Sequence, residues 1–477
     1  MIDELALDIP ALDRARISRD ARFDGKFFIA VKTTGIYCRP ICPSRTSNSR
    51  NVRYYATAAA AAEAGFRPCL RCRPEAAPGT PAWLGTSAVV RRALRLIEQG
   101  ILDHQSVDDL AQKLGLGSRH LRRLFFKHVG ASPVSFAQTR RLQFAKRLLD
   151  ETTLPITEVA LAAGFGSVRR FNTTFLQTYG RAPREFRKKG RKDEGPEDEV
   201  ILKLAFRPPY DWKQVISFFS KQAIPGVEHV TEEGYCRTLR INGTAAIVSV
   251  RPLVEDDSLE LSVKGAPSNT LLQIATMARR VFDTSADPSR TTFALRSDSL
   301  LGPCVKQRPG LRIAGEWDPF ECAVRAIMHP HSLSLAWLVN RFGDQIISRT
   351  NDLQLLFPTP AVLANVDIVA GGPSKKRWTS VQKLARSVVE GKLDFSAAAD
   401  CVVRQLVQVS DLDLSTAEYI ALRGLGEPDA FPADDEELRQ FGSETDRPLS
   451  CEELLARAES WRPWRGYAAF HVWSCAD

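Results

Sequence analysis

The spacing of apolar residues changes twice along the chain and divides it into a front, a middle and a rear part. From about residue 87 to 187, apolar residues recur at helical spacing, as in the run Val90, Ala93, Leu94 and Ile97. The rear half opens instead with β-rich runs at residues 201–206, 236–241 and 245–250, and helical spacing dominates from Trp317 onward. We therefore predict an all-helical middle part followed by a mixed α and β rear part.

Two segments without apolar periodicity separate these parts. Residues 76–80 (AAPGT), followed by Pro81, are small and rich in helix breakers, and residues 188–199 (KKGRKDEGPEDE) are charged. These linkers and the change from strand to helix in the rear half predict four domains, at residues 1–78, 84–188, 200–300 and 310–477.

The composition is ordinary for a globular protein, with an excess of positive charge. Hydrophobic residues make up 44% and charged residues 25% of the 477 positions, and the formal net charge is +9, which favours a polyanionic partner. The first twenty residues are charged and lack the apolar core of a signal peptide, and no apolar run has the length of a membrane span. We expect a cytoplasmic protein without a membrane partner.

Four of the ten cysteines lie close together before residue 75, and the others are scattered singly. Cys38 and Cys42 form a C-x3-C pair, and Cys69 and Cys72 form a C-x2-C pair. Two such pairs on separate loops can surround one zinc ion with four sulfurs and so stabilise a domain that has little core of its own. Tight pairing in a cytosolic protein is rarely accidental, which favours zinc over four unrelated buried cysteines.

The segments around these cysteines, TTGIYCRP and AGFRPCLRCRP, resemble the N-terminal domain of the Ada family of methyl-phosphotriester repair proteins over about the first 75 residues. The resemblance implies one zinc ion held by all four cysteines, and transfer of a methyl group from a DNA phosphotriester to one zinc-bound sulfur. By its place in the motif, the acceptor is Cys38. A metal keeps cysteine as its nucleophilic thiolate at neutral pH, so this chemistry is physically consistent.

Basic residues surround the same motif and are expected to contact the DNA backbone: Arg39, Arg45, Arg67, Arg71 and Arg73. Methylation turns a thiolate into a neutral thioether and removes one negative charge near the DNA phosphates. This predicts tighter promoter binding by the methylated protein. The alternative from the residues alone is a structural zinc site with a solvated basic face.

A helix-turn-helix pattern occurs twice in the middle part. The first copy, SVDDLAQKLGLGSRHLRRLFFKHVG, has an apolar stripe, a glycine-rich turn and a second apolar stripe, and the second copy, ITEVALAAGFGSVRRFNTTFLQTYGRAPREFR, repeats this order about 50 residues later. The second helix of each copy is basic, and two such copies in one chain are typical of DNA recognition.

The second copy resembles the signature of the AraC family of regulators, and the likeness covers about residues 85–188. It implies two recognition helices in successive major grooves. The side chains expected to face DNA are Ser118, Arg119, His120, Arg122 and Arg123 in the first copy and Ser167, Arg169, Arg170 and Asn172 in the second. The alternative for the arginines is a solvated helix face.

The rear half resembles the AlkA family of alkylbase DNA glycosylases, within the helix-hairpin-helix superfamily, over about residues 200–475. The likeness is carried by QRPGLRIAGEWDPFECAVRAIM, YIALRGLGEPDAFPADDEELRQ and WRPWRGYAAFHVW. It implies that Asp435, preceded by Asp434, is the catalytic carboxylate and that Tyr419 and Trp473 stack on the extruded base. A carboxylate stabilises positive charge on the sugar, and an aromatic wall attracts a cationic alkylated purine. The alternative to a catalytic role is that Asp435 is an ordinary carboxylate at the N-terminus of a helix. The alternative to base stacking is that Trp473 is an ordinary core residue.

Two stretches depart from the family pattern. The hairpin, Leu-Pro-Gly-Ile-Gly in the family, reads Val409, Ser410, Asp411, Leu412, Asp413 here, so carboxylates stand where glycine N–H groups approach a phosphate. The stretch His329-Pro330-His331-Ser332 differs from the residues usual where a side chain wedges into the duplex. No lysine lies between the hairpin and Thr416, so lyase activity is not expected, and the Pro-Cys-His-Arg motif of O6-alkylguanine methyl acceptors is absent.

These patterns predict a multidomain, mostly α-helical protein, made of a small zinc-bound α+β domain, an all-α double helix-turn-helix domain, an AlkA-like α+β domain and an all-α helix-hairpin-helix glycosylase domain. The predicted function combines methyl-phosphotriester sensing and transcription regulation with monofunctional excision of alkylated purines of the 3-methyladenine type. The expected cofactor is one Zn²⁺ ion, and the expected partner is double-stranded DNA, both promoter and alkylated. RNA polymerase is a further candidate partner, and we expect a monomer. The alternative function is a methylation-responsive regulator whose glycosylase-like domain is inactive.

Overall fold

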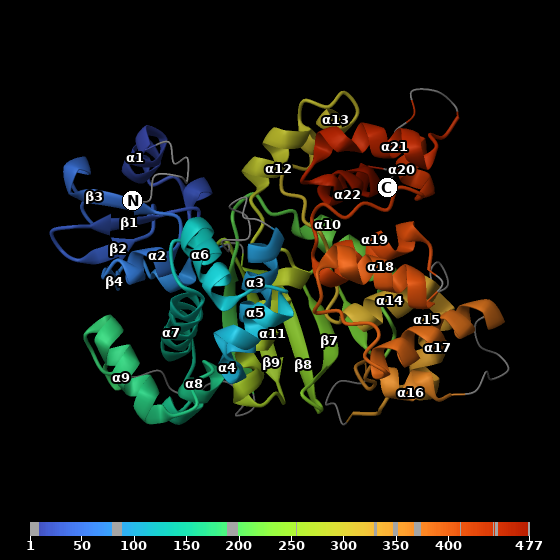
Figure 1. The fold of residues 1–477 in the computed structure, drawn as a ribbon, viewed down its shortest axis with the longest axis horizontal. Helices are drawn as coiled ribbons and strands as arrows, with labels where there is room; N and C mark the ends of the chain where they lie inside the picture. The colour runs from blue at the N-terminus through green and yellow to red at the C-terminus, as the bar shows by residue number, and fades with distance from the viewer. Residues whose placement is uncertain are drawn as a thin grey trace. The chain divides into compact units, whose positions relative to one another are not determined.

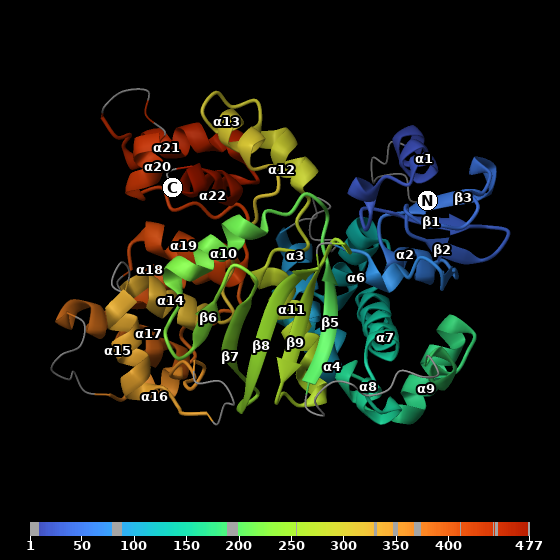
Figure 2. The same cartoon turned by 180° about the vertical axis from the view of Figure 1, so that it is seen from behind.

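The computed structural model describes residues 9–78, 88–187, 199–253, 255–328, 332–346, 352–366, 374–410, 412–441, 443 and 447–475 (Figure 1, Figure 2). The chain divides into two compact units. Unit 1 comprises Met1–Pro208, Leu253–Thr276 and Thr284–Ala286, and unit 2 comprises Pro209–Pro252, Met277–Asp283 and Asp287–Asp477. Each unit joins segments of more than one predicted domain, so the division into four domains stays a prediction. Among the described residues, no helix has both the length and the apolar character needed to cross a membrane.

The front part of unit 1 is a four-stranded sheet with a helix on each face (blue in Figure 1). Its strands lie in the order β3-β1-β2-β4, and their bounds are β1 Phe28–Val31, β2 Ile36–Cys38, β3 Val52–Tyr55 and β4 Arg67–Pro68. Strand β1 pairs antiparallel with both neighbours, whereas β4 runs parallel to β2, with Pro68 opposite Tyr37.

Alternation along these strands divides the apolar residues between the two faces of the sheet. On one face, Phe28, Ala30 and Tyr37 pack against helix α2 (Ala58–Glu63). On the other, Ile29 and Val52 pack against helix α1 (Ile9–Ser18). The 3-10 turns η1 (Ala21–Phe23), η2 (Ser49–Asn51) and η3 (Pro74–Ala76) complete this part of the chain.

The helical middle part predicted from the sequence is confirmed. Its helices are α3 Ala88–Glu98, α4 Ile101–His104, α5 Val107–Lys113, α6 Ser118–Val129, α7 Pro133–Glu151, α8 Ile156–Ala162 and α9 Val168–Tyr179, and the 3-10 turn η5 Pro183–Phe186 follows them. Ser106 begins α5 with a reciprocal capping box to Asp109, and Ser132 begins α7 by accepting a hydrogen bond from the Ser135 N–H.

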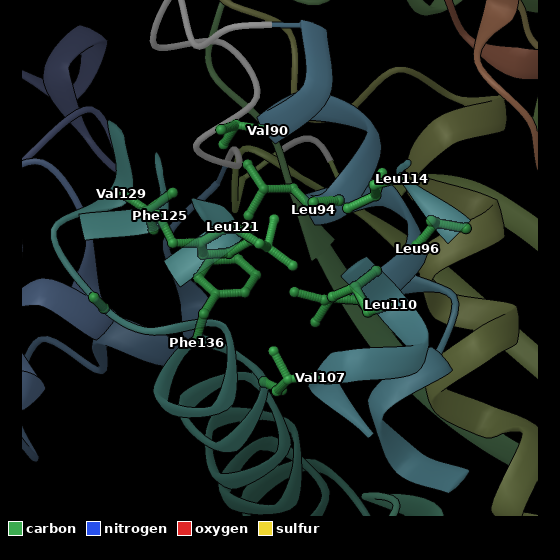
Figure 3. Close-up of a cluster of buried hydrophobic side chains, with 14 of the residues drawn as sticks. Val90, Leu94, Leu96, Val107, Leu110, Leu114, Leu121, Phe125, Val129 and Phe136 are labelled. Carbon is green, nitrogen blue, oxygen red and sulfur yellow. The ribbon is translucent and has the colours of Figure 1, made fainter. Parts of the chain in front are cut away.

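The core of the first helix-turn-helix copy is formed by apolar residues at helical spacing on three helices (Figure 3). Leu94 of α3, Leu110 of α5, and Leu121 and Phe125 of α6 are completely buried and point toward one another. Leu94 belongs to the apolar run identified from the sequence, and Leu110, Leu121 and Phe125 belong to the two apolar stripes of the first helix-turn-helix copy.

Helices α6 and α9 repeat one design. Each residue from Ser118 to Val129 is buried, half-buried or exposed in the same way as the residue 50 positions later. Both helices end at a glycine in the left-handed conformation, Gly130 (φ 75°) and Gly180 (φ 72°). The internal duplication predicted from the sequence is therefore present in the structure.

Unit 1 also contains two strands from the rear half of the sequence. Strand β5 (Glu199–Ala205) pairs antiparallel with β9 (Ser258–Lys264), from Glu199 opposite Lys264 to Ala205 opposite Ser258. Helix α7 contacts β5, where Arg147 donates a hydrogen bond to the Lys203 carbonyl. The 3-10 turn η6 (Ser268–Thr270) follows β9.

Unit 2 begins with helix α10 (Trp212–Gln222) and three antiparallel strands, β6 Glu228–Val230, β7 Tyr235–Ile241 and β8 Thr244–Leu253. The β7–β8 hairpin turns through Asn242 and Gly243, both at positive φ (47° and 81°), as a two-residue hairpin requires. Three strand runs predicted from the sequence thus lie in β5, β7 and β8, whereas β6 and β9 were not predicted.

The remainder of the chain is helical. The helices are α11 Leu271–Val281, α12 Pro288–Leu295, α13 Leu301–Gln307, α14 Pro319–Met328, α15 Ser332–Phe342, α16 Pro360–Ala364, α17 Lys375–Val389, α18 Ala399–Ser410, α19 Leu414–Leu425, α20 Glu436–Phe441, α21 Cys451–Ala458 and α22 Arg465–Cys475, and the 3-10 turn η7 Glu459–Trp461 lies between α21 and α22. After the strands, helices therefore resume at Leu271, well before Trp317. Helix α19 packs against α14 and α18, and α22 packs against α13 and α20.

Candidate functional site

The four front cysteines converge although they come from two separate loops. Cys38 ends β2 and Cys69 follows β4, and the Cys69 N–H donates a hydrogen bond to the Tyr37 carbonyl at 2.9 Å, so the parallel strand pair brings these two residues together. All four Sγ atoms lie within 4.8 Å of one another. Among the described residues, this is the one group of cysteine, histidine and acidic side chains with the spacing of a metal site.

This arrangement fits zinc. Four sulfurs around one zinc ion, each about 2.3 Å from it, lie about 3.8 Å apart, which agrees with the observed cluster. Hydrogen bonds from Cys38, Cys69 and Cys72 lower the pKa of the Cys42 thiol, and the same close packing raises the pKa of Cys72. Without a metal, the four close sulfurs therefore favour the thiolate at Cys42 and the thiol at Cys72. A divalent cation removes this difference, because it stabilises the thiolate form at all four positions. The Arg39 N–H donates a hydrogen bond to Cys72 Sγ at 3.3 Å, and this bond also stabilises the thiolate form of that sulfur.

The sulfurs differ in accessibility. Cys69 and Cys72 are buried, at 7% and 6% exposure, whereas Cys38 and Cys42 are half-buried. The C-x3-C pair is therefore the more exposed of the two pairs. The acceptor expected from the sequence, Cys38, belongs to this accessible pair.

The basic residues around the cysteines have separate environments. Arg45, Arg67 and Arg71 are exposed. Arg45 also lines an open polar hollow of about 670 Å³, together with Thr33, Thr46, Ser47, Asn48 and Asn51. These three arginines remain candidates for phosphate contact, because their residues are exposed.

Arg39 and Arg73 are engaged within the protein instead. Arg39 is paired with Asp24 and donates to the Cys72 carbonyl at 3.2 Å, and its side chain is only 13% exposed. Arg73 lies at φ 52° directly after Cys72 and pairs with Asp150 of α7 at 2.9 Å. Both residues thus have structural partners that the sequence did not reveal, since those partners are distant along the chain.

The expected DNA-facing residues of the two helix-turn-helix copies lie at the starts of α6 and α9. Arg119, His120, Arg122 and Arg123 of α6 are exposed, and so are Arg169, Arg170 and Asn172 of α9, whereas Ser118 is half-buried. Ser167 begins α9 by accepting a hydrogen bond from the Arg170 N–H at 3.2 Å. The two helices therefore present corresponding positions to solvent, which carry Arg119, Arg122 and Arg123 in α6 and Arg169 and Arg170 in α9.

In unit 2, the three residues expected for base excision lie together although they come from three segments. Asp435 precedes α20 and accepts hydrogen bonds at Oδ1 from the Leu438 N–H (3.0 Å) and from Trp473 Nε1 (3.1 Å). Trp473 of α22 meets Tyr419 of α19 edge to face, with ring centroids 6.1 Å apart. All three side chains are half-buried, which leaves part of each accessible. Burial raises the pKa of Tyr419, so its phenol is neutral.

Further side chains hold the Asp435 loop in place, and the sequence analysis did not identify them. The Asp434 N–H donates to Ser415 Oγ at 3.1 Å, and the Phe431 N–H donates to Glu418 at 3.2 Å, so the first turns of α19 fix the loop backbone. The Asp434 carboxylate accepts hydrogen bonds from Arg439 (3.1 Å) and from the Cys451 thiol (3.0 Å). The spacing of Ser415 four residues before Tyr419 is the one sequence signal that points to this helix face.

The hairpin between α18 and α19 carries one described carboxylate. Asp413 caps α19, accepting hydrogen bonds from the Thr416 N–H (2.7 Å) and hydroxyl (2.8 Å), and it is exposed. Asp411, residues 329–331 and residues 188–198 of the second linker lie outside the described residues. The carboxylate of Asp413 thus occupies the helix end where a phosphate would otherwise find N–H donors.

Comparison with known proteins matches the parts of this chain one by one. A family model described as the metal binding domain of Ada matches residues 11–75, one described as a helix-turn-helix domain matches residues 110–189, and one described as the AlkA N-terminal domain matches residues 201–318. The match over residues 11–75, together with the four-sulfur cluster, identifies a site for one Zn²⁺ ion. The multidomain, mostly helical architecture expected from the sequence is confirmed.

Individual relatives cover the chain to different extents. The "probable bifunctional transcriptional activator/DNA repair enzyme AlkA" of Mycobacterium tuberculosis is 38% identical over 97% of this chain and 96% of its own length. DNA-3-methyladenine glycosylase 2 of Escherichia coli is 30% identical over 57% of this chain and 95% of its own length. The solved 3-methyladenine DNA-glycosylase from Archaeoglobus fulgidus aligns with 57% of this chain and 96% of its own, at 20% identity and a TM-score of 0.48.

Proposed function

Because this chain belongs to the family of bifunctional transcriptional activator/DNA repair enzymes that join Ada-type and AlkA-type parts, we propose that it combines three activities on DNA. It receives methyl groups from DNA phosphotriesters, regulates transcription, and excises alkylated purines. The observation that carries the excision activity is the meeting of Asp435, Tyr419 and Trp473 at one place in unit 2.

The methyl acceptor is Cys38. Its sulfur attacks the methyl carbon of the phosphotriester, a carbon–sulfur bond forms, and the carbon–oxygen bond breaks with its electron pair left on the phosphate oxygen. Coordination to zinc would keep the sulfur as a thiolate at neutral pH. The half-buried position of Cys38 at the end of β2 supports this role, because the residue is more exposed than Cys69 and Cys72. Each molecule accepts one methyl group, since the thioether is stable.

Methylation of Cys38 strengthens promoter binding. Conversion of a thiolate into a thioether removes one negative charge from a surface that faces phosphates, and the exposed Arg45, Arg67 and Arg71 then act with less opposition. The exposed residues at the starts of α6 and α9 supply the contacts to base edges in the major groove. Double-stranded DNA, both promoter and alkylated, is the partner.

Excision proceeds by hydrolysis of the bond between base and sugar. As this bond breaks, its electron pair goes to the cationic base, which leaves neutral, and positive charge develops on the sugar. The Asp435 carboxylate stabilises that charge and orients the water that adds to the sugar carbon, and the proton that this water loses passes to the carboxylate and from there to solvent. The rings of Tyr419 and Trp473 attract a cationic purine more strongly than a neutral one. Lesions of the 3-methyladenine type fit this site, and monofunctional hydrolysis follows because no lysine lies between the hairpin and Thr416.

The test is release of free base from methylated duplex DNA, measured by chromatography at saturating protein. Asp435→Asn keeps the size of the side chain and removes its charge, so we expect a loss of at least about 100-fold in the excision rate. Glu436→Gln, the exposed neighbour on α20, is the matched control and should excise at the wild-type rate.

A second function is favoured by one observation, the Asp413 carboxylate at the start of α19. If wild-type protein releases no base at saturating concentration while it still binds promoter DNA, the excision activity is excluded. The chain is then a methylation-responsive regulator whose rear part only binds DNA.

A further inference from the structure

Behind Tyr419, unit 2 contains a continuous group of buried charges. It consists of three acidic and three basic side chains, each with 8% or less of its surface exposed: Glu228, Glu316, Glu321, Arg237, Arg325 and Arg423. Their formal charges cancel. Isolated buried charges are strongly unfavourable, so a balanced group of this size is retained only where close pairing compensates its desolvation.

The group runs from the strands of unit 2 toward α19. Arg237 of β7 pairs with Glu321 at 2.8 Å, and Arg325 of α14 pairs with Glu321 and with Glu228 of β6, each at 2.6 Å. Arg325 also lies 3.7 Å from Glu316. Glu316 in turn pairs with Arg423 of α19 at 2.8 Å, so Arg423 is the member of the group that reaches the candidate excision site.

Arg423 is held through hydrogen bonds from two nitrogens of its guanidinium group, while Nη2 forms the ion pair with Glu316. Nη1 donates to Tyr419 Oη and to Gln222 Oε1, each at 2.7 Å, and Nε donates to the Ala314 carbonyl at 2.8 Å. The guanidinium carbon also lies 5.5 Å from the centroid of the Tyr419 ring. Because contacts on several sides hold Arg423, its position is fixed, and it transfers that rigidity to the tyrosine one helical turn away.

These contacts decide which part of Tyr419 is available. The hydroxyl oxygen is occupied by Arg423, inside the protein, whereas the ring meets Trp473 edge to face and the side chain remains half-buried. A base that enters beside Trp473 therefore meets a ring and not the phenol oxygen. The site can select by charge and shape, without a hydrogen bond from Tyr419 to a particular purine.

We propose that Arg423 is a positioning residue for base excision: it holds the Tyr419 ring in the orientation that stacks on an alkylated purine, and it is itself held by the buried charges of unit 2. The proposal rests on the proposed excision of alkylated purines. It also gives the strand-containing part of unit 2 a role in the reaction, since Glu228 and Arg237 come from β6 and β7.

The test is a double-mutant cycle on the full-length protein with Arg423→Lys, Tyr419→Phe and both changes together. Arg423→Lys keeps the charge opposite Glu316 and loses the forked hydrogen bonds, and Tyr419→Phe keeps the ring and loses the hydroxyl. We expect each single change to lower the single-turnover excision rate at saturating protein by on the order of 10-fold. The double variant should be less than about 3-fold slower than either single variant, because both changes remove the same link.

A matched control separates positioning from folding. Arg465→Lys changes another largely buried arginine of unit 2, which pairs with Asp429 at 3.0 Å. It should leave the excision rate at saturating protein near that of wild type. Should Arg423→Lys prevent folding, the charge-balanced pair Arg423→Met with Glu316→Gln takes its place in the cycle. Multiplicative loss in the double variant, or an equal loss in Arg465→Lys, would overturn the proposal.

A binding measurement distinguishes failure of this inference from failure of the proposed function. Affinity for a free methylated purine cation, 3,9-dimethyladeninium, is measured by isothermal titration and needs the stacking pocket but no chemistry. If wild type releases no base from DNA, the proposed excision fails. The inference then stands only if wild type binds the cation and Arg423→Lys and Tyr419→Phe weaken that binding non-additively. Equal binding by wild type and both variants contradicts it.

Discussion

The indole N–H of Trp473 donates a hydrogen bond to Oδ1 of Asp435 at 3.1 Å. A residue expected only as a stacking wall is therefore also a direct partner of the candidate catalytic carboxylate. The same oxygen accepts a hydrogen bond from the Leu438 N–H at 3.0 Å, so these two hydrogen bonds orient Asp435 through one oxygen. This leaves Oδ2 as the atom best placed to meet the sugar or the attacking water.

Trp473→Phe separates these two roles. Phenylalanine keeps an aromatic wall but cannot donate to Asp435, so we expect base binding to change little and the chemical step to slow. Loss of a hydrogen bond to a charged group corresponds to about 1.5–3 kcal/mol, or roughly 10- to 100-fold in single-turnover rate. Trp212→Phe, which removes the indole bond to the Glu232 carbonyl, is the control and should excise normally. A Trp473→Phe protein with the wild-type rate would show that the hydrogen bond is dispensable.

Zinc content tests the four-sulfur site. Purified protein should carry one zinc per chain by elemental analysis, and the double change Cys69→Ser with Cys72→Ser should abolish it. Because the front part has a small core, loss of metal should also lower its thermal stability and its resistance to protease. Cys401→Ser, at a half-buried cysteine of α18, should retain the metal. Zinc that persists in the double variant would place the ion elsewhere.

Methyl transfer to Cys38 can be followed by mass spectrometry of the protein after incubation with DNA that contains methyl phosphotriesters. We expect one added methyl group on the peptide that contains Cys38, and none in Cys38→Ser. Methylated protein should bind promoter DNA more tightly by about 1 kcal/mol or more, roughly 5-fold, because one negative charge near phosphate is removed. The assignment of the acceptor is wrong if Cys42 or another cysteine carries the methyl group.

We expect the hairpin carboxylates to lower the affinity of the protein for DNA. Asp413→Asn keeps a side chain that can cap α19 but removes its charge, and Asp413→Gly removes both the cap and the charge. If repulsion limits binding, both variants, alone or with Asp411→Gly, should bind a duplex with an abasic site about 5-fold more tightly at low salt. Asp413→Gly alone should lose a few tenths of a kcal/mol of stability. If all variants bind this duplex with wild-type affinity, the carboxylates do not limit DNA binding.

His471 predicts a stability change between pH 6.5 and 4. It is 3% exposed, and burial, aided by Arg308, lowers its pKa to about 4. Between these values the unfolded chain binds a proton that the folded chain does not, so the free energy of unfolding falls as the pH falls, by up to about 3 kcal/mol.

His471→Gln removes this titration. The drop in unfolding midpoint from pH 7 to pH 4.5 should therefore be smaller in the variant than in wild type. Tryptophan fluorescence reports mainly on unit 2, because every tryptophan except Trp83 falls in it. Equal drops in both proteins would show that His471 is not responsible.

The sequence by itself was sufficient for the parts of this protein that depend on short-range spacing. The C-x3-C and C-x2-C spacing predicted each pair of sulfurs, because residues three or four apart are held close by any compact loop, whereas the parallel pairing of β2 with β4 brings the two pairs together. The apolar stripes on α5, α6, α8 and α9 were also predicted from the sequence. One face of a helix must be apolar to pack, and apolar residues therefore recur along the chain at helical spacing.

Only the tertiary structure decided how distant residues pair. Nothing local to Arg39 indicated that it would join Asp24 rather than face solvent, and nothing local to Asp435 indicated that Trp473 would donate to it. The contacts of Arg423 could not be predicted from the sequence for the same reason, because its partners Glu316 and Gln222 are distant along the chain. Such contacts arise when separate helices and strands bury their apolar faces against one another and bring their polar groups together. Packing therefore determines them, and periodicity along the chain does not record them.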